Sequence, residues 1–478
     1  MRVLVLNPPS QNNESISRDL IYGCWCHGKR VASIQPPPLN LMYIATILKN
    51  EGHSVKLLDA LAEKKRPNDI KSIASNFDIV IIASSNTTFL YDVHVIKILK
   101  DINPNLICIF CGPHTTVYPK KALEKKEIDY GVHGEYEWTI KELVNKLSKH
   151  EDISDVLGIS YRKGKEIIVT PNRPFIENLD DLPIPDRRMI NPNLYFNPLA
   201  KKKSFTTALT SRGCIGRCIF CTSPAFYGKK YRLRSAENVL KELEYLVSLG
   251  YKDILFRDEI FTAHRKRLED ICHGIIDRKL DIVWASNARI GTLNEDLLRL
   301  MKRAGCYCIW FGVESGSQQI LDNIKKDIKV EMIEQTFKMA RKVGIETHAH
   351  LMFGNPGETK ETLRQSIDFL KKIKADTMDI GILTPFPGTE LFDSISEKAN
   401  LGDGTQLDID NVHTKTFFNE YICHLKNKDI EDAILIAYKE FYLRPSYIFH
   451  RFFKIRSFTD FVNNVKSGFY TVLFTFKK

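Results

Sequence analysis

Three cysteines in the middle of the chain lie close enough together to hold a metal cluster. Cys214, Cys218 and Cys221 form the pattern C-x3-C-x2-C, and Gly213 and Gly216 stand before and within it. Thiolates are the ligands of iron–sulfur clusters, and this spacing lets three of them converge from one loop. Three protein ligands for four irons leave one iron open to an exogenous group. The triplet therefore predicts a [4Fe–4S] cluster with an open position.

Two alternative interpretations of the triplet are weaker. A structural zinc site needs four Cys or His ligands, but the next cysteine, Cys272, is distant and has no C-x-x-C partner. Chance clustering of buried cysteines does not explain why glycine stands at 213 and 216, where a tight loop needs it.

The cysteine loop follows the first of six predicted β/α units. Apolar runs alternate with amphipathic helical stretches, and strands are expected at Thr206–Thr210, Asp253–Phe256, Asp281–Ala285, Cys308–Val313, Glu346–Phe353 and Thr377–Leu383. Six such units predict a partial, TIM-like (β/α)6 barrel, whose active site lies at the carboxyl ends of its strands. After about residue 390 the pattern changes to a mainly helical tail.

The N-terminal part of the chain shows the same α/β alternation. Its apolar runs are Val3–Leu6, Val55–Leu58, Ile79–Ala83 and Leu106–Phe110. Such runs, separated by helices, predict a doubly wound, flavodoxin-like parallel sheet. Ligands of these sheets bind at the carboxyl ends of the strands, where this chain has polar loops rich in Gly and Pro.

These patterns divide the chain into four expected segments. Residues 1–150 form the doubly wound domain, and residues 151–200 form a proline-rich linker. Residues 201–395 form the partial barrel, and residues 396–478 form a helical region that shapes the substrate pocket or packs on the body.

Five segments in register resemble the radical S-adenosylmethionine (SAM) superfamily. They are the cysteine loop and, at later strand ends, Phe256–Thr262, Phe311–Ser317, Gly354–Thr359 and Thr384–Thr389. The resemblance implies that Cys214, Cys218 and Cys221 hold the cluster and that SAM binds its open iron. Reduction by an external donor of the flavodoxin or ferredoxin type would cleave SAM to a radical that abstracts hydrogen from the substrate.

The same resemblance implies roles for residues at the barrel strand ends. Asp258 and Glu259 would accept hydrogen bonds from the ammonium group of SAM, and Arg289 would pair with its carboxylate. Glu314 would bind the ribose, and Leu351–Phe353 would pack against the adenine. An ordinary solvated charge or a helix cap is the alternative for each charged residue.

Residues 1–150 resemble the cobalamin-binding domain that precedes the barrel in one branch of this superfamily. The resemblance implies that the polar loops bind cobalamin through Asn7, Pro8, Pro9, Ser84, Thr87, Thr88, Gly112, His114, Thr115, Gly134 and Glu135. The family more often has glycine at the positions of Asn40 and Cys111. Another nucleotide-like ligand, or none, is the alternative.

No histidine is placed to bind cobalt from below. Cobalamin proteins with such a ligand carry D-x-H-x-x-G after the first strand, where this chain has Asn7-Pro8-Pro9-Ser10. Asp92 and His94 lie inside a predicted helix and lack the glycine. We therefore expect base-off cobalamin without a histidine ligand.

The two domains together predict a cobalamin-dependent radical methyltransferase. One SAM would supply a methyl group through cobalamin and a second would supply the radical, so that an unactivated carbon of a small-molecule, lipid or natural-product substrate is methylated. A radical cyclase or rearrangement enzyme is the alternative. A cobalamin sensor would give the cysteine triplet no role, and tRNA methylthiolation would call for a further N-terminal cysteine cluster.

Composition narrows the class of partners. The net charge of +11 permits acidic partners, but it is spread thinly, so nucleic acid is not expected. Eleven cysteines argue for reduced thiols, and the N-terminus is typical of a buried strand rather than a signal peptide. These features predict a cytoplasmic protein.

Three further features leave alternatives open. Cys24 and Cys26 are a redox pair or ordinary loop thiols. His348 and His350 share one side of a barrel strand, where they contact substrate or accept a proton if that side faces the lumen, or are satisfied core histidines. The basic, aromatic tail from residue 439 to 478 packs on the body or makes peripheral contact with an anionic membrane.

Overall fold

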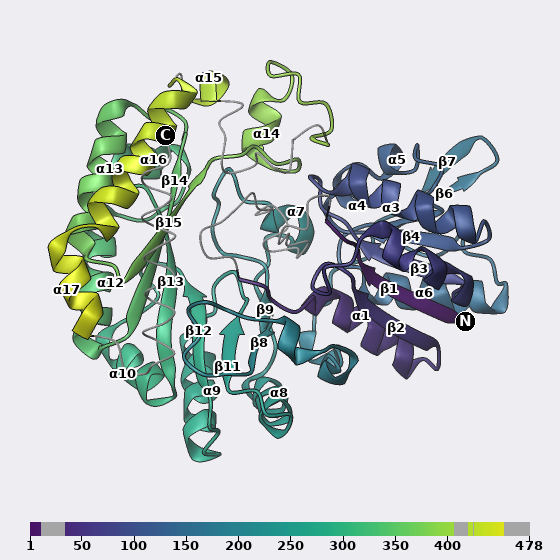
Figure 1. Cartoon of the computed structure of the whole chain (residues 1–478), viewed down its shortest axis with the longest axis horizontal. Coiled ribbons are helices and arrows are strands. Elements are labelled where there is room, and N and C mark those ends of the chain that lie inside the picture. The colour runs from purple at the N-terminus through teal and green to yellow at the C-terminus, as the bar shows by residue number, and fades with distance from the viewer. Residues whose placement is uncertain (11–33, 406–418, 424, 454–478) are drawn as a thin grey trace.

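The computed structural model describes residues 1–10, 34–405, 419–423 and 425–453. Two sheets dominate it, one in each half of the chain, and they lie beside each other with the cysteine loop on the side that faces the N-terminal sheet (Figure 1). The α/β class and the two predicted sheet architectures are confirmed.

The first sheet has the strand order β2-β1-β3-β4-β5-β6-β7. Its parallel strands are β1 (Arg2–Asn7), β2 (Ser54–Asp59), β3 (Ile79–Ala83), β4 (Ile107–Cys111) and β5 (Tyr130–Val132). Apolar side chains of α1 (Leu39–Asn50) and α6 (Glu137–Lys149) cover one face, and those of α3 (Phe89–Ile102) cover the other. Because both faces are buried, the strands are apolar throughout, as parallel strands of this kind are.

An antiparallel hairpin extends this sheet beyond residue 150. It consists of β6 (Ile159–Lys163) and β7 (Glu166–Val169), and β6 pairs with β5. These residues lie in the stretch expected to be a linker. The hairpin is short, half-buried and charged, so its apolar pattern is too weak to mark it in the sequence.

The second sheet has the order β15-β14-β13-β12-β11-β8 and is parallel throughout. Its strands are β8 (Phe205–Ala208), β11 (Asp253–Phe256), β12 (Val283–Ala288), β13 (Cys306–Glu314), β14 (Glu346–Phe353) and β15 (Thr377–Ile382). The outer face packs on α8 (Ala236–Ser248), α9 (Arg265–Asp277), α10 (Glu295–Arg303), α12 (Val330–Val343) and α13 (Lys360–Ile373). This outer layer forms the largest apolar core of the molecule.

The described residues cover part of the inner face of the second sheet. Apolar residues of the proline-rich stretch, among them Ile190, Leu194 and Tyr195, pack on Leu255 and Cys308 at its inner side. This strap joins the two halves of the molecule, because Gln35 also forms a backbone bridge with Phe196.

The described part of the tail packs on the barrel. Helices α16 (Asn427–Tyr442) and α17 (Pro445–Phe453) lie along α13 and β15 (Figure 1). The Tyr442 hydroxyl donates to the carbonyl oxygen of Met378 at 2.6 Å, and Tyr447 donates to that of Asp376 at 2.9 Å. Phe449 is 67% exposed. Phe441, Tyr442 and Tyr447 thus pack on the body as expected, whereas Phe449 is mostly exposed, and residues 454–478 lie outside the described part, as do Cys24 and Cys26.

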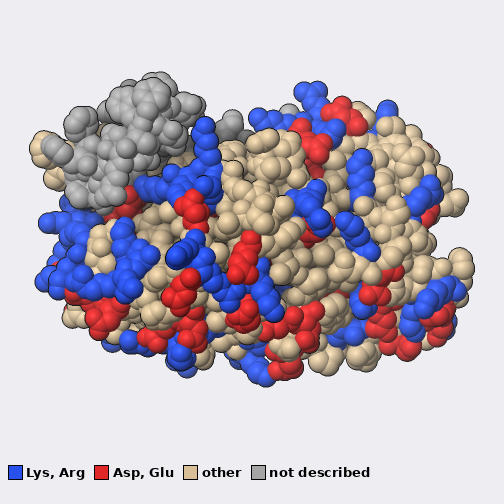
Figure 2. All heavy atoms as spheres, turned by 90° about the horizontal axis from the view of Figure 1, so that it is seen from below, with Lys and Arg blue, Asp and Glu red and all other residues tan. Residues whose placement is uncertain are grey.

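The surface is a mixture of charges. Figure 2 shows Lys and Arg interspersed with Asp and Glu across one face, and close pairs such as Lys252 and Asp281, 2.7 Å apart, contribute to this pattern. Within the described ranges, we find no helix with the length and apolar character required to cross a bilayer.

Candidate functional site

The cysteine loop lies between β9 (Ser211–Arg212) and α7 (Ser223–Tyr227). Cys214, Cys218 and Cys221 are partly exposed. The Gly216 amide donates to Cys214 Sγ at 3.3 Å. A Cβ atom on Gly216 would lie 3.4 Å from Cys214 Sγ and 3.7 Å from Cys218 Sγ. At least two of the sulfurs therefore border one space that glycine leaves open, and three thiols on one loop fit an iron–sulfur cluster.

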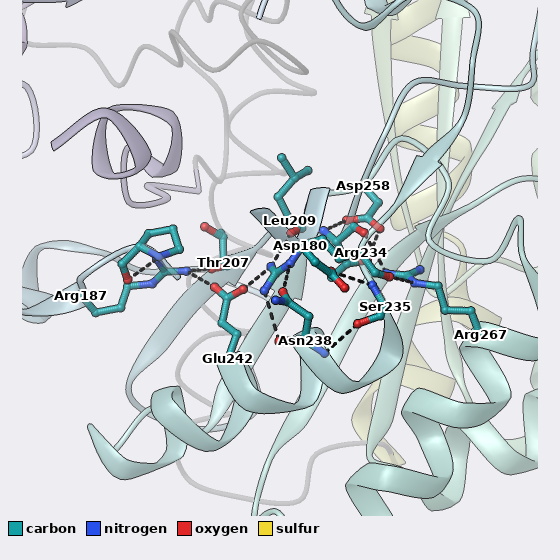
Figure 3. Close-up of polar contacts among 12 residues, drawn as sticks. Asp180, Arg187, Thr207, Leu209, Arg234, Ser235, Asn238, Glu242, Asp258 and Arg267 are labelled. Carbon is teal, nitrogen blue, oxygen red and sulfur yellow. Dashed lines mark hydrogen bonds and ion pairs between the residues drawn. The ribbon is translucent and has the colours of Figure 1, made fainter. Parts of the chain in front are cut away.

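Buried arginines fix the strand end that carries this loop. Three guanidinium groups donate to carbonyl groups at and just beyond the end of β8 (Figure 3): Arg187 to Thr207 at 2.8 Å, Arg234 to Leu209 at 2.9 Å and Arg267 to Thr210 at 2.8 Å. Glu242 of α8 accepts from both Arg187 and Arg234. Buried charges are tolerated when they are paired and hydrogen-bonded, so this network holds the strand end in one position.

Asp258 belongs to the same network and is fully buried at the end of β11. It accepts the Thr210 amide at 2.7 Å, the Thr210 hydroxyl at 2.5 Å and the Ser211 hydroxyl at 2.7 Å. Both carboxylate oxygens are thus engaged within the protein. These hydrogen bonds give Asp258 a positioning role at the cysteine loop, and its expected contact with SAM stays a prediction.

Glu259 differs from its neighbour. One carboxylate oxygen accepts the Ser223 hydroxyl at 2.7 Å, and the other is buried with no hydrogen-bonding partner among the described residues. Burial, together with the charge of Asp258, raises the pKa of Glu259 to about 8. A buried, unpaired carboxylate oxygen is costly, and a cationic group would relieve that cost. Glu259 therefore fits the expected contact with the ammonium group of SAM.

Arg289, Glu314 and Lys326 gather on the other side of the loop. Arg289 donates to the carbonyl oxygen of Lys326, and its Nη1 would lie 2.9 Å from a Cβ atom on Gly216. Lys326 Nζ donates to Glu314 Oε1 at 2.6 Å. Glu314 has a φ of 61°, at a register shift between β13 and β14. Such strained backbone is typical of functional sites. Arg289 and Glu314 are thus close to the loop, although Glu314 already has a cationic partner.

The side chains of the strand expected to contact adenine alternate between the two faces of the sheet. Leu351 and Phe353 belong to the outer core beneath the helices, whereas Met352 packs with Ile219 in an apolar cluster next to the cysteine loop. Only Met352 of the three residues is therefore on the side of the site. The correction follows from the two-residue period of a strand.

Several polar residues of the first sheet stabilise their own loops. The Ser84 and Thr88 hydroxyls each donate to Asp92 at 2.7 Å. Asn7 donates to Asp59 at 2.8 Å, and the Tyr195 hydroxyl donates to the same carboxylate at 3.0 Å. The side-chain groups expected to bind cobalamin at these positions are thus engaged within the protein.

Most of the other residues expected to bind cobalamin also form hydrogen bonds within the protein. The Thr115 hydroxyl donates to the Val132 carbonyl oxygen at 2.9 Å. Thr87 lies 3.2 Å from the Ser85 hydroxyl, and the Gly134 amide donates to Thr116 at 3.0 Å. Pro8 and Pro9 are buried after β1. These residues shape the ends of the strands.

Gly112 brings two of these loops together. Its φ is 112°, and a Cβ atom there would lie 2.4 Å from the Ser84 carbonyl oxygen. Only glycine fits this close approach.

Three buried groups at the ends of β1, β3 and β4 have polar atoms with no protein partner in the described ranges. They are the Ser10 hydroxyl, Asn86 Oδ1 and both ring nitrogens of His114. The His114 ring stacks on Phe89 with centroids 3.9 Å apart, and burial lowers its pKa to about 4. Polar atoms without partners at this edge of a doubly wound sheet fit a large ligand with many amide groups, such as cobalamin.

Glu135 connects the two halves of the molecule. It accepts Arg212 Nη1 at 3.0 Å, Arg232 Nη1 at 2.7 Å and the Ile176 amide at 2.7 Å. Arg212 also pairs with Glu137, and all four charged side chains are buried. Because Arg212 immediately precedes the cysteine loop, Glu135 is an interdomain anchor, and its expected contact with cobalamin stays a prediction.

Comparison with known proteins agrees with this geometry. Residues 209–370 match the Radical SAM superfamily, and residues 30–144 match the B12 binding domain. An uncharacterised methyltransferase of Pyrococcus horikoshii is 35% identical over 467 residues, which cover 96% of each chain. The chain belongs to the radical SAM superfamily. It is a member of the branch with a cobalamin-binding domain.

A further relative and a solved structure extend the comparison. The anaerobic magnesium-protoporphyrin IX monomethyl ester cyclase of Rubrivivax gelatinosus is 27% identical over 453 residues, 91% of this chain and 79% of the relative. The cobalamin-dependent radical enzyme OxsB, solved with aqua-cobalamin and SAM, has a TM-score of 0.72 and 16% identity, covering 99% of this chain and 72% of that one. The latter likeness supports the fold.

The cofactor set of this radical SAM enzyme is a [4Fe–4S] cluster, SAM and cobalamin. The cysteine loop would hold the iron–sulfur cluster, Glu259 and Arg289 would contact SAM, and the His114 edge of the first sheet would hold cobalamin. The absence of a histidine ligand to cobalt stays a prediction.

Sequence reasoning missed Asp59, Asp92, Arg212, Ser223 and Lys326. Asp92 was considered only with His94, as a false match to the D-x-H-x-x-G motif. A carboxylate near the start of a helix that packs on an apolar sheet could have indicated a buried hydrogen-bond acceptor. The others gain meaning only from register or tertiary contact. Asp59, for example, is the β2 residue directly opposite Asn7.

Proposed function

We propose that this radical SAM enzyme methylates an unactivated carbon of a small-molecule or lipid substrate. The observation that carries the proposal is the buried anchor formed by Glu135, Glu137, Arg212 and Arg232. It ties the cobalamin-binding domain directly to the start of the cysteine loop. Such a connection is expected when both cofactors serve one reaction.

The residues of the chain bind and orient the reactants. When bound, the cluster and SAM supply radical chemistry and cobalamin supplies methyl transfer. Glu259 receives the ammonium group of SAM, and Arg289 is placed for its carboxylate. Asp258 and the three buried arginines keep the loop fixed, so that the cofactors meet in one geometry.

A radical cyclase is the second candidate, because the Rubrivivax relative carries that name. The Pyrococcus relative, named a methyltransferase, is more similar and matches nearly the full length of both chains. We therefore favour methyl transfer.

The test uses full-length protein loaded with cluster and cobalamin, reduced, and supplied with SAM that carries a deuterated methyl group. An extract of small molecules and lipids from the organism that produces this protein provides candidate substrates. We expect 5′-deoxyadenosine, S-adenosylhomocysteine and a product whose mass increases by one deuterated methyl group. Formation of 5′-deoxyadenosine with a product that carries no label would favour the cyclase instead.

We further infer a cytoplasmic enzyme that receives electrons from a flavodoxin- or ferredoxin-type donor and does not act on nucleic acid. The mixed charges of Figure 2 support the last point. Peripheral membrane contact through residues 454–478 is tested by co-sedimentation with anionic vesicles. Equal recovery of the full chain and a chain ending at 453 would reject it.

A further inference from the structure

A second polar cluster lies on the inner face of the barrel sheet. His348 and His350 of β14 stand opposite Thr377 and Asp379 of β15 in the parallel register. The intervening Ala349 belongs to the outer core. Because side chains alternate along a strand, the four polar residues share the inner face.

The donor atoms of this cluster converge. His350 Nδ1 lies 2.6 Å from Asp379 Oδ1, and His348 Nε2 lies 3.5 Å from the same oxygen. The two imidazole centroids are 4.5 Å apart. One ligand atom from each of the three residues can be chosen so that all lie within 4.8 Å of one another. Two imidazoles and a carboxylate therefore surround a common point.

The surrounding residues hold this arrangement in place. The Thr377 hydroxyl lies 2.7 Å from His348 Nδ1, which orients the ring so that Nε2 points to the cluster. The Trp310 ring packs on both imidazoles, with centroids 5.6 and 5.8 Å away. A hydrogen bond to the outer ring nitrogen is the usual support of a metal-binding histidine. All of these residues are on strands, which are rigid supports for a site.

The cluster is reachable from the barrel interior. The His350 and Asp379 side chains are 23% and 32% exposed. The residue opposite His350 on β13 is Gly312, and a Cβ atom there would lie 2.7 Å from Lys326 Nζ. The His348 cluster is thus next to the Glu314–Lys326 ion pair, and it lies before that pair along the direction of the strands.

We propose that His348, His350 and Asp379 bind one divalent transition-metal ion inside the barrel. Ligands at about 2.0–2.2 Å from a Zn²⁺ ion lie roughly 3–3.5 Å apart, so small side-chain rotations bring the three donors into place. A two-histidine, one-carboxylate set leaves coordination positions open. These positions face the interior and take water or an oxygen donor of the substrate. The proposal does not depend on methyl transfer.

The test uses full-length protein without a histidine tag. The protein is loaded with the iron–sulfur cluster and cobalamin, so that the cysteine loop is occupied. Zn²⁺ is the probe. After incubation and removal of loosely bound metal, zinc is counted by mass spectrometry and its ligands are read from the zinc-edge X-ray absorption spectrum. We expect about one zinc per chain with two imidazole ligands, as two histidines and one carboxylate require.

Matched variants locate the ion. His350→Gln and Asp379→Asn should each weaken zinc binding by at least about tenfold, and Thr377→Val should weaken it less, as loss of an outer support does. His53→Gln, which changes an imidazole bonded to Asn145 in the first domain, should retain the zinc. Iron content and thermal unfolding confirm that each variant is folded and loaded.

Two results would overturn the proposal. If the wild-type protein retains no zinc, then His348, His350 and Asp379 form only a hydrogen-bonded group. Retention that is equal in wild type, His350→Gln and Asp379→Asn places the zinc elsewhere. Formation of S-adenosylhomocysteine in the same preparations reports methyl transfer separately, so failure of one proposal is distinguishable from failure of the other.

Discussion

The two sheets of this enzyme expose different parts to their ligands. The first sheet is covered by helices on both faces, so only its strand ends are available for a ligand. Among the described residues, the second sheet has helices on its outer face and a strap over part of its inner face. Its strand ends carry the cysteine loop, and its inner face carries the His348 cluster. In the described part of the chain, polar side chains on a sheet face can therefore contact a ligand where no layer of helices covers that face.

Within each set of strand ends, neighbouring polar residues divide into two kinds. Asp258 is saturated by Thr210 and Ser211, whereas Glu259 keeps one oxygen without a partner among the described residues. In the first sheet Ser84 is saturated by Asp92, whereas His114 is not saturated. Saturated groups position the loops, and unsaturated groups are available to cofactors. The following variants test this division.

The largest effect is expected from the cysteine loop. Cys218→Ala should abolish cluster assembly and with it the cleavage of SAM, because two thiolates do not complete the site. Cys272→Ala is the matched control, since Cys272 is buried in α9 within the outer core and should cost only about 1 kcal/mol of stability. Iron content and 5′-deoxyadenosine formation after reconstitution measure the difference. Normal iron in Cys218→Ala would contradict the assignment of the cluster.

The interdomain anchor should give the next largest effect. Glu135→Ala leaves Arg212 and Arg232 without their shared buried partner, and breaking a buried ion pair typically costs about 3–5 kcal/mol. Glu177→Ala removes an exposed pair with Lys230 and should change stability by no more than about 0.5 kcal/mol. Denaturant unfolding of the cofactor-free chain gives both values. Similar losses in the two variants would show that the anchor does not hold the domains together.

Much of this organisation follows from sequence patterns, and the remainder does not for physical reasons. Apolar runs located four strands of the first sheet, where burial on both faces makes them continuous, and the apolar pattern also located the six strands of the second sheet. The short hairpin β6–β7 was missed because it is half-buried and charged. The cysteines are recognisable from local spacing, but the partners of Asp258 and Glu135 come from distant segments. Local sequence therefore predicts that a polar residue stands at a strand end, but not which group saturates it.

The adjacent carboxylates at the end of β11 provide a sharper comparison. Glu259→Gln should weaken SAM binding by about 10- to 100-fold, because a hydrogen bond to a charged group contributes about 1.5–3 kcal/mol. Its unfolding midpoint should stay unchanged. Asp258→Asn should mainly lower stability, because an amide nitrogen would face the donors of Thr210 and Ser211. Equilibrium binding of SAM and thermal unfolding separate the two, and an exchange of these effects would reverse the assigned roles.

The smallest effect concerns acid stability of the cofactor-free first domain. Burial lowers the pKa of His114 to about 4, below the value of about 6.5 in an unfolded chain. The unfolded state therefore binds the proton more readily, and stability is lost as pH falls from about 6.5 toward about 4. At about pH 5.5 the loss amounts to about 1.2 kcal/mol relative to neutral pH. His114→Phe, which preserves the stacking on Phe89, should remove this loss, whereas His94→Gln on the exposed side of α3 should retain it. Denaturant unfolding at the two pH values measures the difference, and equal acid losses in the two variants would show that His114 is not the buried group that responds to the proton. Cobalamin binding by His114→Phe then reports separately whether the imidazole contacts the cofactor.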